Sequence, residues 1–461
     1  MLTRTWRPIV LVAGETSLLV LAVAAASYLR LGREAWVGLA SPGGILRIFV
    51  VVFVCQTCLY YADLYNLRTL SERRDLFIGG FRAIGVASLV LAALYFWFPE
   101  WIIGRGVFAL TALIGVATIV GWRVVFGWLT SRVGPRERLL LVGTNSAAVE
   151  LARELFDRRQ ELGAEIVGFV DPDPARVGAA VINPGVIGTI DDIPVLVTDH
   201  DIDRVVVTLS DARGKLPMHR LLDIRLRNGV MFDHLASVYE EYTGKIAVEN
   251  LRPSWLIFSE GFRKTRVLMA AKRGFDLAAA LIGLIVTAPA MLAFAAAIKL
   301  TSRGPVLYHQ ERVGLNGHII RVHKFRTMRE DAEADTGPVW SQANDDRITP
   351  VGRFLRNVRL DELPQLWNVL RGEMSLVGPR PERPSFVAHL AAEIPFYGQR
   401  HVVKPGITGW AQIRYTYGAS VEDAIQKLQY DLYYIKNLSM ALDCMIVLET
   451  IKTVLLRRGA R

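Results

Sequence analysis

The chain has little cysteine. Only three cysteines occur in 461 residues, too few for the disulfide framework of a small secreted domain. Cys55 and Cys58 form a C-x-x-C pair inside an apolar run, and no second ligand pair accompanies them. We therefore interpret them as small lipid-buried side chains rather than as a redox or metal site.

Charge is also scarce. Only 21% of the residues are charged while 52% are hydrophobic, and the mean hydropathy is +0.29. These values are typical of a membrane protein. The length predicts two or three domains.

Nucleic-acid-binding motifs are missing, although the formal net charge is +10. Residues 263–461 carry the whole excess, with 28 Lys+Arg against 18 Asp+Glu, but neither a zinc-finger spacing nor a ribonucleoprotein aromatic motif occurs. We expect no nucleic-acid partner. The basic half instead suits phosphates or anionic lipid head groups.

Four apolar segments have the length needed to cross a bilayer, at residues 8–29, 45–66, 80–98 and 107–129. They predict a four-helix transmembrane domain over 1–133. The first segment has features of a cleaved signal peptide, but Glu15 inside it and the further segments behind it favour a retained helix. Nine flanking arginines against four place the N-terminus and everything after residue 130 in the cytoplasm.

An α/β alternation follows. Strands are expected at 139–142, 166–170 and 204–209 and a helix at 147–159, which predicts a Rossmann-like, doubly wound domain over 134–250. Its first turn, GTNSAA at 143–148, has Asn145 in place of the second glycine of G-x-G-x-x-G. That glycine normally admits a pyrophosphate, so a cofactor-free structural or regulatory domain is favoured over a dinucleotide-binding one. Residues 251–271 are expected to be a linker.

A fifth apolar stretch, residues 277–300, has basic residues at both ends. Both ends are therefore expected on the cytoplasmic side, and Pro289 near the middle removes a helix hydrogen bond and can bend the segment. We predict a re-entrant helix over 272–300 that enters and leaves on the same face. A straight fifth span is the alternative.

The remaining residues, 301–461, are polar and contain two adjacent carboxylates, Asp361 and Glu362, among arginines. Such a cluster predicts a strongly charged partner, most simply a phosphorylated substrate at a membrane surface. Pro364 is tolerated in the first turn of a helix, so Asp361 is expected near a helix N-terminus whose dipole keeps it ionised. Residues 439–456 suit an interfacial amphipathic helix, with a core-packed helix nearly as well supported.

Six ordered motifs in this part resemble the bacterial sugar transferase family, the polyprenyl-phosphate phosphoglycosyl transferases that begin cell-surface glycan assembly on a lipid carrier. The motifs are 272–276 (KRGFD), 323–328 (HKFRTM), 346–356 (DRITPVGRFLR), 360–366 (LDELPQL), 375–382 (SLVGPRPE) and 404–410 (KPGITGW). The preceding regions resemble the long-form members. The resemblance implies a mainly α catalytic domain over 272–461, in the bacterial cytoplasmic membrane and facing the cytoplasm.

The resemblance also implies transfer of hexose-1-phosphate from a UDP-sugar to undecaprenyl phosphate, with the sugar left open and a homodimer as a possible assembly. A carboxylate that attacks the sugar-bearing phosphorus would split this exchange into two steps, and Asp361 is the candidate nucleophile. Glu362 matches the second member of the family's Asp-Glu pair. Both carboxylates are candidate ligands of Mg²⁺, which would offset the diphosphate charge.

Four cations are candidate phosphate clamps, since guanidinium and ammonium groups suit phosphate oxygens. They are Lys324, Arg326, Arg356 and Arg380. Three residues at the start of the re-entrant helix, Lys272, Arg273 and Asp276, are expected to anchor it at the lipid head groups.

Two rival functions come from other classes. One is a membrane-bound, NAD-dependent sugar-nucleotide epimerase or dehydratase built on the Rossmann-like domain; Asn145 and the lack of a nearby Tyr-x-x-x-Lys weigh against it. The other is a non-enzymatic scaffold for polysaccharide assembly, which the intact pair Asp361-Glu362 disfavours.

Overall fold

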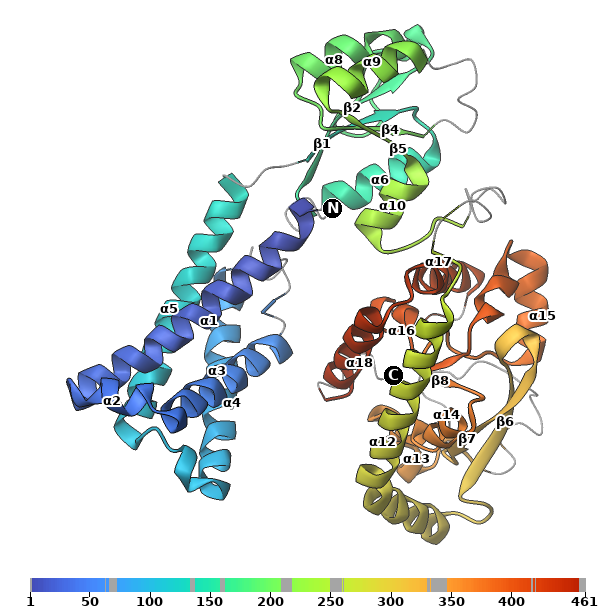
Figure 1. Cartoon of the computed structure of the whole chain (residues 1–461). Coiled ribbons are helices and arrows are strands. Elements are labelled where there is room, and N and C mark those ends of the chain that lie inside the picture. The colour runs from blue at the N-terminus through green and yellow to red at the C-terminus, as the bar shows by residue number, and fades with distance from the viewer. Residues whose placement is uncertain are drawn as a thin grey trace. The chain divides into compact units, whose positions relative to one another are not determined.

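The computed structural model describes residues 2–62, 64–65, 73–132, 137–157, 162–208, 218–248, 259, 261–329, 332, 346–415, 418 and 420–455. Of the predicted linker 251–271, residues 251–258 and 260 lie outside them, and its last residues, from Arg266, belong to a helix. The chain divides into two compact units, Met1–Leu235 and Ala236–Arg461, and each is described separately (Figure 1).

The first unit begins with the predicted four apolar helices, which confirms that part of the fold. They are α1 (Leu2–Leu31), α3 (Pro42–Tyr61), α4 (Arg73–Trp97) and α5 (Arg105–Arg132). Short connectors, α2 (Glu34–Ala40) and a 3₁₀ turn (Pro99–Trp101), join them. Each of the four contains a stretch long and apolar enough to cross a bilayer, so the protein is a membrane protein.

A buried ion pair lies inside this bundle. Arg123 of α5 and Glu15 of α1 meet at 2.6 Å, with side chains 1% and 0% exposed. Arg123 also donates to the carbonyl of Leu64 and lies over the ring of Tyr65, 5.2 Å from its centroid. The polar residue that interrupts the first apolar segment therefore links helices rather than facing lipid.

The second part of this unit is a five-stranded parallel sheet in the order β3-β2-β1-β4-β5. Its strands are β1 (Glu137–Val142), β2 (Ala164–Asp171), β3 (Val186–Thr189), β4 (Arg204–Val207) and β5 (Met231–His234). Helices α6 (Ser146–Asp157), α8 (Ile193–Asp199) and α9 (Met218–Asn228) connect them. The order confirms a doubly wound, Rossmann-like fold.

Asn145 closes the first turn of this sheet. Its Oδ1 accepts from the backbone N–H of Ala148 at 2.9 Å and caps α6, while its Nδ2 donates to the carbonyl of Thr208 at 2.6 Å, beyond the end of β4. The side chain thus bridges the carboxyl ends of β1 and β4, where doubly wound folds usually receive a ligand. That this domain binds no cofactor stays a prediction.

The second unit starts earlier in the chain than residue 250. Helix α10 (Leu235–Thr243) carries Glu240, which binds Lys436 at 2.6 Å and Asn437 at 2.8 Å. Gly244 accepts from the indole of Trp410 at 2.9 Å. Residues 236–248 therefore pack on the C-terminal unit.

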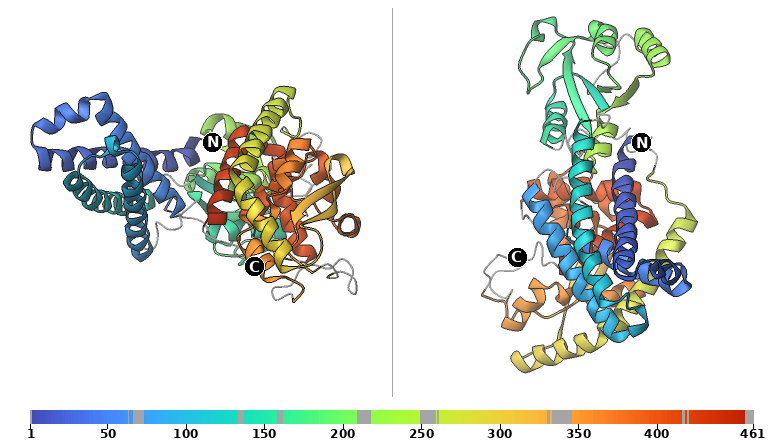
Figure 2. Two further views of the ribbon diagram at one scale, coloured as in Figure 1. Left: turned by 90° about the horizontal axis from the view of Figure 1, so that it is seen from below. Right: turned by 90° about the vertical axis from the view of Figure 1, so that its left-hand side faces the viewer.

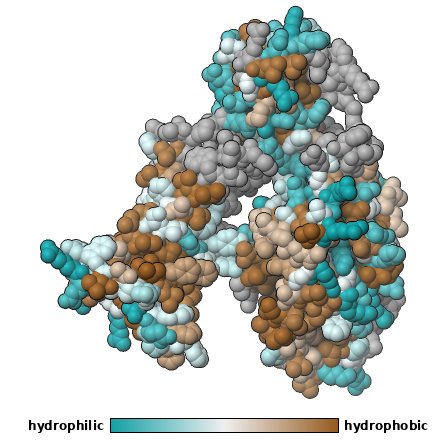
Figure 3. Space-filling model, in the orientation of Figure 1, coloured by the Kyte–Doolittle hydropathy of each residue, from teal (hydrophilic) through white to brown (hydrophobic). Residues whose placement is uncertain are grey.

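The fifth apolar stretch forms one long helix, α12 (Arg266–Thr301), with Pro289 inside it. The ribbon changes direction part-way along this helix (Figures 1 and 2), and the missing backbone donor of Pro289 accounts for a bend there. The side chains of its second half are widely exposed and apolar, which makes the lower part of this unit hydrophobic in Figure 3. That α12 re-enters the membrane stays a prediction.

The rest of this unit is mainly helical. A hairpin of β6 (Leu307–Val313) and β7 (Ile319–Phe325) is followed by α13 (Pro350–Asn357) and α14 (Gln365–Arg371). Parallel strands β8 (Ser375–Val377) and β9 (Gly406–Thr408) lie among helices α15 (Pro384–Glu393), α16 (Trp410–Arg414), α17 (Val421–Asn437) and α18 (Met440–Leu455), and a 3₁₀ segment covers Tyr397–Val402.

Helix α18 faces the protein with its polar side. Asp443 is 0% exposed, whereas Met445, Leu448 and Ile451 are each more than a third exposed. The charges that interrupt the apolar run at 439–456 therefore do not all mark a water-facing side, as an interfacial helix would require. Helix α18 therefore packs on the protein through Asp443 and exposes an apolar stripe, and that this stripe lies in the membrane interface stays a prediction.

The Glu15–Arg123 pair predicts a stability effect. Glu15→Leu leaves the Arg123 charge buried without its partner, so the helical bundle should lose about 3–5 kcal/mol of stability. The double variant Glu15→Leu/Arg123→Met should regain most of this loss, because no unpaired charge remains. Thermal and denaturant unfolding in detergent measure both, with Ser17→Leu on the exposed side of α1 as the control. A double variant as unstable as the single one contradicts the assignment.

Candidate active site

The two adjacent carboxylates lie on a single 3₁₀ turn, Leu360–Glu362, between α13 and α14. Arg359, just before the turn, has a φ of 54°, a left-handed conformation that is uncommon for a non-glycine residue and is often found at functional sites. Leu360 and Leu363 pack on the apolar cluster around Phe325. Because these two leucines point inward, the carboxylates between them are held at the surface of that cluster.

Glu362 is bound by two cations. Its Oε1 accepts from Nζ of Lys324 at 2.7 Å and from Nη2 of Arg380 at 2.6 Å, and its Oε2 lies 3.2 Å from Nη1 of Arg380. Burial opposes ionisation, but the charges of Arg380 and Lys324 outweigh it and hold the pKa of Glu362 well below its usual range. Glu362 is therefore a fixed negative charge.

Asp361 is half-buried, and no described residue donates a hydrogen bond to its side chain. Burial, and next the charge of Glu362, raise the pKa of Asp361 to about 6, against the opposing charges of Lys324, Arg356 and Arg380. Asp361 lies just before α14, near a helix N-terminus as predicted, but burial and the like charge raise its pKa rather than lower it. Asp361 is ionised at neutral pH but close to its titration range.

Lys324 reaches Glu362 because α14 is attached to β7. Asn368 of α14 is fully buried; its Oδ1 accepts from the backbone of His323 at 3.1 Å and its Nδ2 donates to the carbonyl of Arg321 at 2.7 Å. These bonds fix the strand that carries Lys324 beside the turn that carries Glu362. Sequence reasoning missed Asn368, for which the only signal was a polar residue within an apolar helix.

Arg400 binds the backbone of Arg380. Like Asn368, Arg400 was not identified from the sequence motifs. Nη2 of Arg400 donates to the carbonyl of Arg380 at 3.0 Å and binds Asp431 at 2.8 Å, while its Nη1 donates to the hydroxyl of Tyr397 at 2.7 Å. Arg400 is 6% exposed. A buried guanidinium with both terminal nitrogens bound in this way holds the backbone that presents Arg380 to Glu362.

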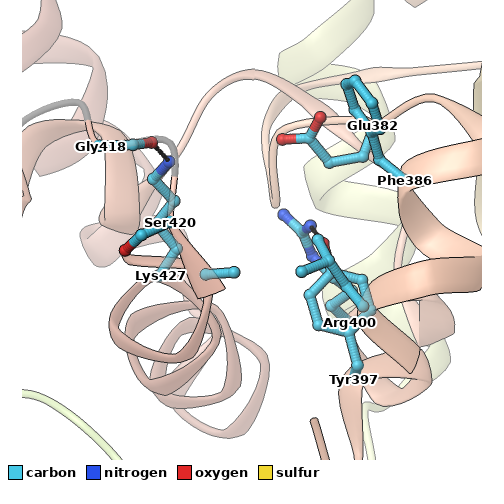
Figure 4. A pocket seen from close by; sticks show the side chains of 9 residues that line it. Glu382, Phe386, Tyr397, Arg400, Gly418, Ser420 and Lys427 are labelled. Atoms are coloured by element: carbon cyan, nitrogen blue, oxygen red, sulfur yellow. Dashed lines mark hydrogen bonds between the residues drawn. The ribbon is translucent and has the colours of Figure 1, made fainter. Parts of the chain in front are cut away.

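A small hollow lies beside this support. Glu382, Phe386, Tyr397 and Arg400 line one side, and Gly418, Ser420 and Lys427 line the other, where Nζ of Lys427 donates to the carbonyl of Gly418 at 2.8 Å (Figure 4). Glu382 also accepts from Arg312 at 3.3 Å. The hollow therefore adjoins the segment 380–382 that forms one wall of the carboxylate site.

The three residues expected at the lipid head groups instead bind the protein, which corrects that prediction for the side chains of α12. Lys272 is 5% exposed and meets Asp443 at 2.6 Å, and Asp276 is 2% exposed and accepts from the backbone of Leu376 at 3.0 Å. Arg273 donates to the last carbonyls of α14, at 2.6 and 2.8 Å. These three polar side chains bind residues that are distant in the sequence, and such pairings cannot be predicted from the local sequence.

The four predicted phosphate clamps differ in their partners. Lys324 and Arg380 contact Glu362 directly, and the charge of Arg356 lowers the pKa of Asp361. Arg326 makes no described contact with either carboxylate and donates through Nη2 to Ser302 at the end of α12.

The donor set suits a magnesium ion only in part. Among the described residues, no group of three or more His, Cys, Asp or Glu side chains is placed to hold a metal. Asp361, with no hydrogen-bond donor on its carboxylate, and the adjacent Glu362 supply the one or two carboxylates that Mg²⁺ usually takes when substrate phosphates complete its shell. The site therefore fits a metal that arrives with a phosphorylated substrate.

Two family models match this chain. A family model described as bacterial sugar transferase matches residues 267–457, and one described as CoA-binding domain matches residues 61–228. The first covers every residue of the site described above.

Three curated relatives are similar over longer stretches. A UDP-N-acetylgalactosamine-undecaprenyl-phosphate N-acetylgalactosaminephosphotransferase of Aeromonas hydrophila is 44% identical, over 50% of this chain and 53% of its own length. An undecaprenyl-phosphate glucose phosphotransferase of Komagataeibacter xylinus is 36% identical over 70% and 60%. A UDP-glucose:undecaprenyl-phosphate glucose-1-phosphate transferase of Xanthomonas campestris pv. campestris is 33% identical over 77% and 79%. The chain thus spans just over half of the first relative and about four fifths of the third.

The buried amide of Asn368 predicts a local stability effect. Asn368→Leu leaves the carbonyl of Arg321 and the N–H of His323 without partners, at a cost of about 1–3 kcal/mol for each group. Denaturant unfolding of the purified protein should show this loss, and hydrogen exchange at His323 should quicken. Asn357→Leu, at the exposed end of α13, is the matched control. Equal stability of the two variants would show that Asn368 does not hold α14 to β7.

Proposed function

Because the chain belongs to the bacterial sugar transferase family, we propose that it is a polyprenyl-phosphate sugar-1-phosphate transferase. It moves hexose-1-phosphate from a UDP-sugar to undecaprenyl phosphate and so starts a surface polysaccharide, with the catalytic unit at the cytoplasmic face of the bacterial inner membrane. The observation that carries the proposal is the asymmetry of the two carboxylates: Glu362 is held by Lys324 and Arg380, whereas no described residue donates a hydrogen bond to Asp361.

This asymmetry divides the chemical roles. Glu362 is neutralised by two cations at 2.6 and 2.7 Å and acts as a positioning residue that keeps Lys324 and Arg380 together. Asp361 retains its oxygens for reaction, and its raised pKa makes the carboxylate more basic than an ordinary aspartate. A more basic carboxylate that is still ionised at pH 7 is a better nucleophile.

The proposed reaction has two steps. An oxygen of Asp361 attacks the phosphorus that bears the sugar, the bond from this phosphorus to the bridging oxygen breaks, and UMP leaves with the electron pair. The product is an acyl phosphate between Asp361 and the sugar phosphate. A phosphate oxygen of undecaprenyl phosphate then attacks the same phosphorus, which releases the Asp361 carboxylate and forms the lipid diphosphate sugar.

The surrounding cations reduce the charge repulsion of the first step. A diphosphate that approaches an ionised Asp361 brings further negative charge, and Arg356, Lys324 and Arg380 provide a positive potential at this place. Bound Mg²⁺, held by Asp361, Glu362 and substrate phosphates, would supply further charge neutralisation. The buried support through Arg400 keeps Arg380 in position during the change of charge.

Removal of the nucleophile tests the proposal. Asp361→Asn should lower nucleotide release from a UDP-sugar by roughly 10³-fold or more, because an amide cannot form the acyl phosphate. Incubation of purified protein with a panel of radiolabelled UDP-sugars, followed by denaturing mass analysis, should reveal a sugar-phosphate adduct on residue 361 of the wild type. Exposed Asp199→Asn is the control. Near-normal turnover by Asp361→Asn, or a strict ternary-complex rate law, contradicts the two-step reaction.

The raised pKa of Asp361 predicts an acid limit. Since the ionised form reacts, the rate of nucleotide release should be constant above the pKa and fall as the pH decreases through about 6. In Glu362→Gln, the like charge is absent and its two cations are released, so the pKa of Asp361 should decrease and the acid limit should move to lower pH. Single-turnover release between pH 5 and 8 measures both limits, and an unchanged or higher limit in the variant refutes the electrostatic assignment.

A further inference from the structure

A buried guanidinium outside the carboxylate site has donors without acceptors. Arg326, just after β7, is 6% exposed. Its Nη2 donates to the carbonyl oxygen and the hydroxyl of Ser302, at 3.0 and 2.6 Å. Its Nε and Nη1 atoms are buried and have no hydrogen-bond partner in the part of the chain that the structure describes.

Buried donors of a positively charged group without acceptors favour the binding of an anion. Arginine keeps its proton in proteins, so the charge cannot be relieved by titration. Buried donors of a charged group are among the most costly polar atoms to leave unpaired. The planar fork matches two oxygens of a phosphate, which would satisfy Nε and Nη1 and offset the charge together. A neutral acceptor would satisfy the donors but leave the charge uncompensated.

The position of Arg326 indicates the source of the phosphate. Ser302 is the residue at which α12 ends, and Leu292 and Leu300 of α12 are 72% and 87% exposed. Exposed leucines on this apolar helix form part of the hydrophobic surface seen in Figure 3. A phosphate attached to a hydrocarbon chain satisfies both features at once, since its tail lies along α12 while its head group reaches Arg326.

The same place adjoins the candidate nucleophile. Ile298 near the end of α12, Phe325 beside Arg326, and Leu360 and Leu363 around the carboxylates belong to one apolar cluster. A lipid phosphate at Arg326 is thus held on the cluster that also supports the turn of Asp361. Glu362 binds Lys324 and Arg380 at that turn, whereas the described hydrogen bonds of the Arg326 guanidinium go to Ser302.

We propose that Arg326 and Ser302 form a lipid-phosphate site at the end of α12, separate from the site for the sugar nucleotide. The identification of this lipid with the acceptor, undecaprenyl phosphate, rests on the proposed function. A structural anionic phospholipid shares the same chemistry and is distinguished by experiment.

The test uses Arg326→Met in the full-length chain, purified in neutral detergent. Methionine fills a similar volume without buried unpaired donors, so the lipid-free protein should melt no lower than the wild type. Undecaprenyl phosphate alone should raise the melting temperature of the wild type but not of the variant. The KM for undecaprenyl phosphate should rise at least about tenfold, while single-turnover nucleotide release should change less than about twofold. Exposed Arg329→Met should retain the wild-type response.

The possible outcomes separate the alternatives. If phosphatidylglycerol, but not undecaprenyl phosphate, gives a melting shift that Arg326→Met abolishes, the site holds a structural phospholipid. If both shifts persist in Arg326→Met, or if nucleotide release and acceptor use fall equally, the lipid site is refuted. Ser302→Ala is a milder second variant, expected to raise the KM about threefold. A wild type that releases no nucleotide refutes the proposed function, whereas the melting shift still tests the lipid site.

Discussion

The chemistry of the C-terminal unit depends on the ion pairs that Glu362 makes with Lys324 and Arg380. These contacts, at 2.7 and 2.6 Å, bring together a hairpin strand, a 3₁₀ turn and the segment before α15. They also decide which carboxylate remains available, because they neutralise Glu362 and leave Asp361 with a raised pKa. Without them, two adjacent carboxylates would repel an anionic substrate and each other.

The long helix α12 is part of the same construction. Its first half holds the catalytic unit through Lys272, which pairs with Asp443, and through Arg273, which binds the C-terminal carbonyls of α14. Its second half is apolar and exposed, and it ends at Ser302 beside Arg326. One helix thus connects an exposed apolar surface, a candidate head-group site and the helix that follows Asp361. Because Arg273 of α12 binds the carbonyls of α14, we expect a displacement of α12 to shift the helix that follows Asp361.

Much of the architecture followed from local pattern. The lengths of the apolar segments predicted the four helices of the first unit, and the alternation of short strands and helices predicted its parallel sheet. Both patterns can be read from residues close together in the chain, so they need no knowledge of tertiary contacts. The sequence shows that Asn145 stands where the dinucleotide-binding motif has a glycine. It does not reveal the hydrogen bond from Asn145 to the carbonyl of Thr208, because these residues are 63 positions apart. The assignment of α12 to a re-entrant geometry remains a prediction.

The sequence alone determined that a membrane protein carries an Asp-Glu pair among basic residues, since composition and adjacency need no knowledge of distant partners. Only the tertiary structure decided which acid is neutralised, that Asn368 and Arg400 hold the cations in place, and that Lys272 and Asp276 are buried rather than at head groups. That Arg326 binds a phosphate stays a prediction, but its contact with Ser302 could be seen only in the structure. Each of these outcomes depends on contacts between residues far apart in the chain, where burial and charge, not local propensity, set the energy.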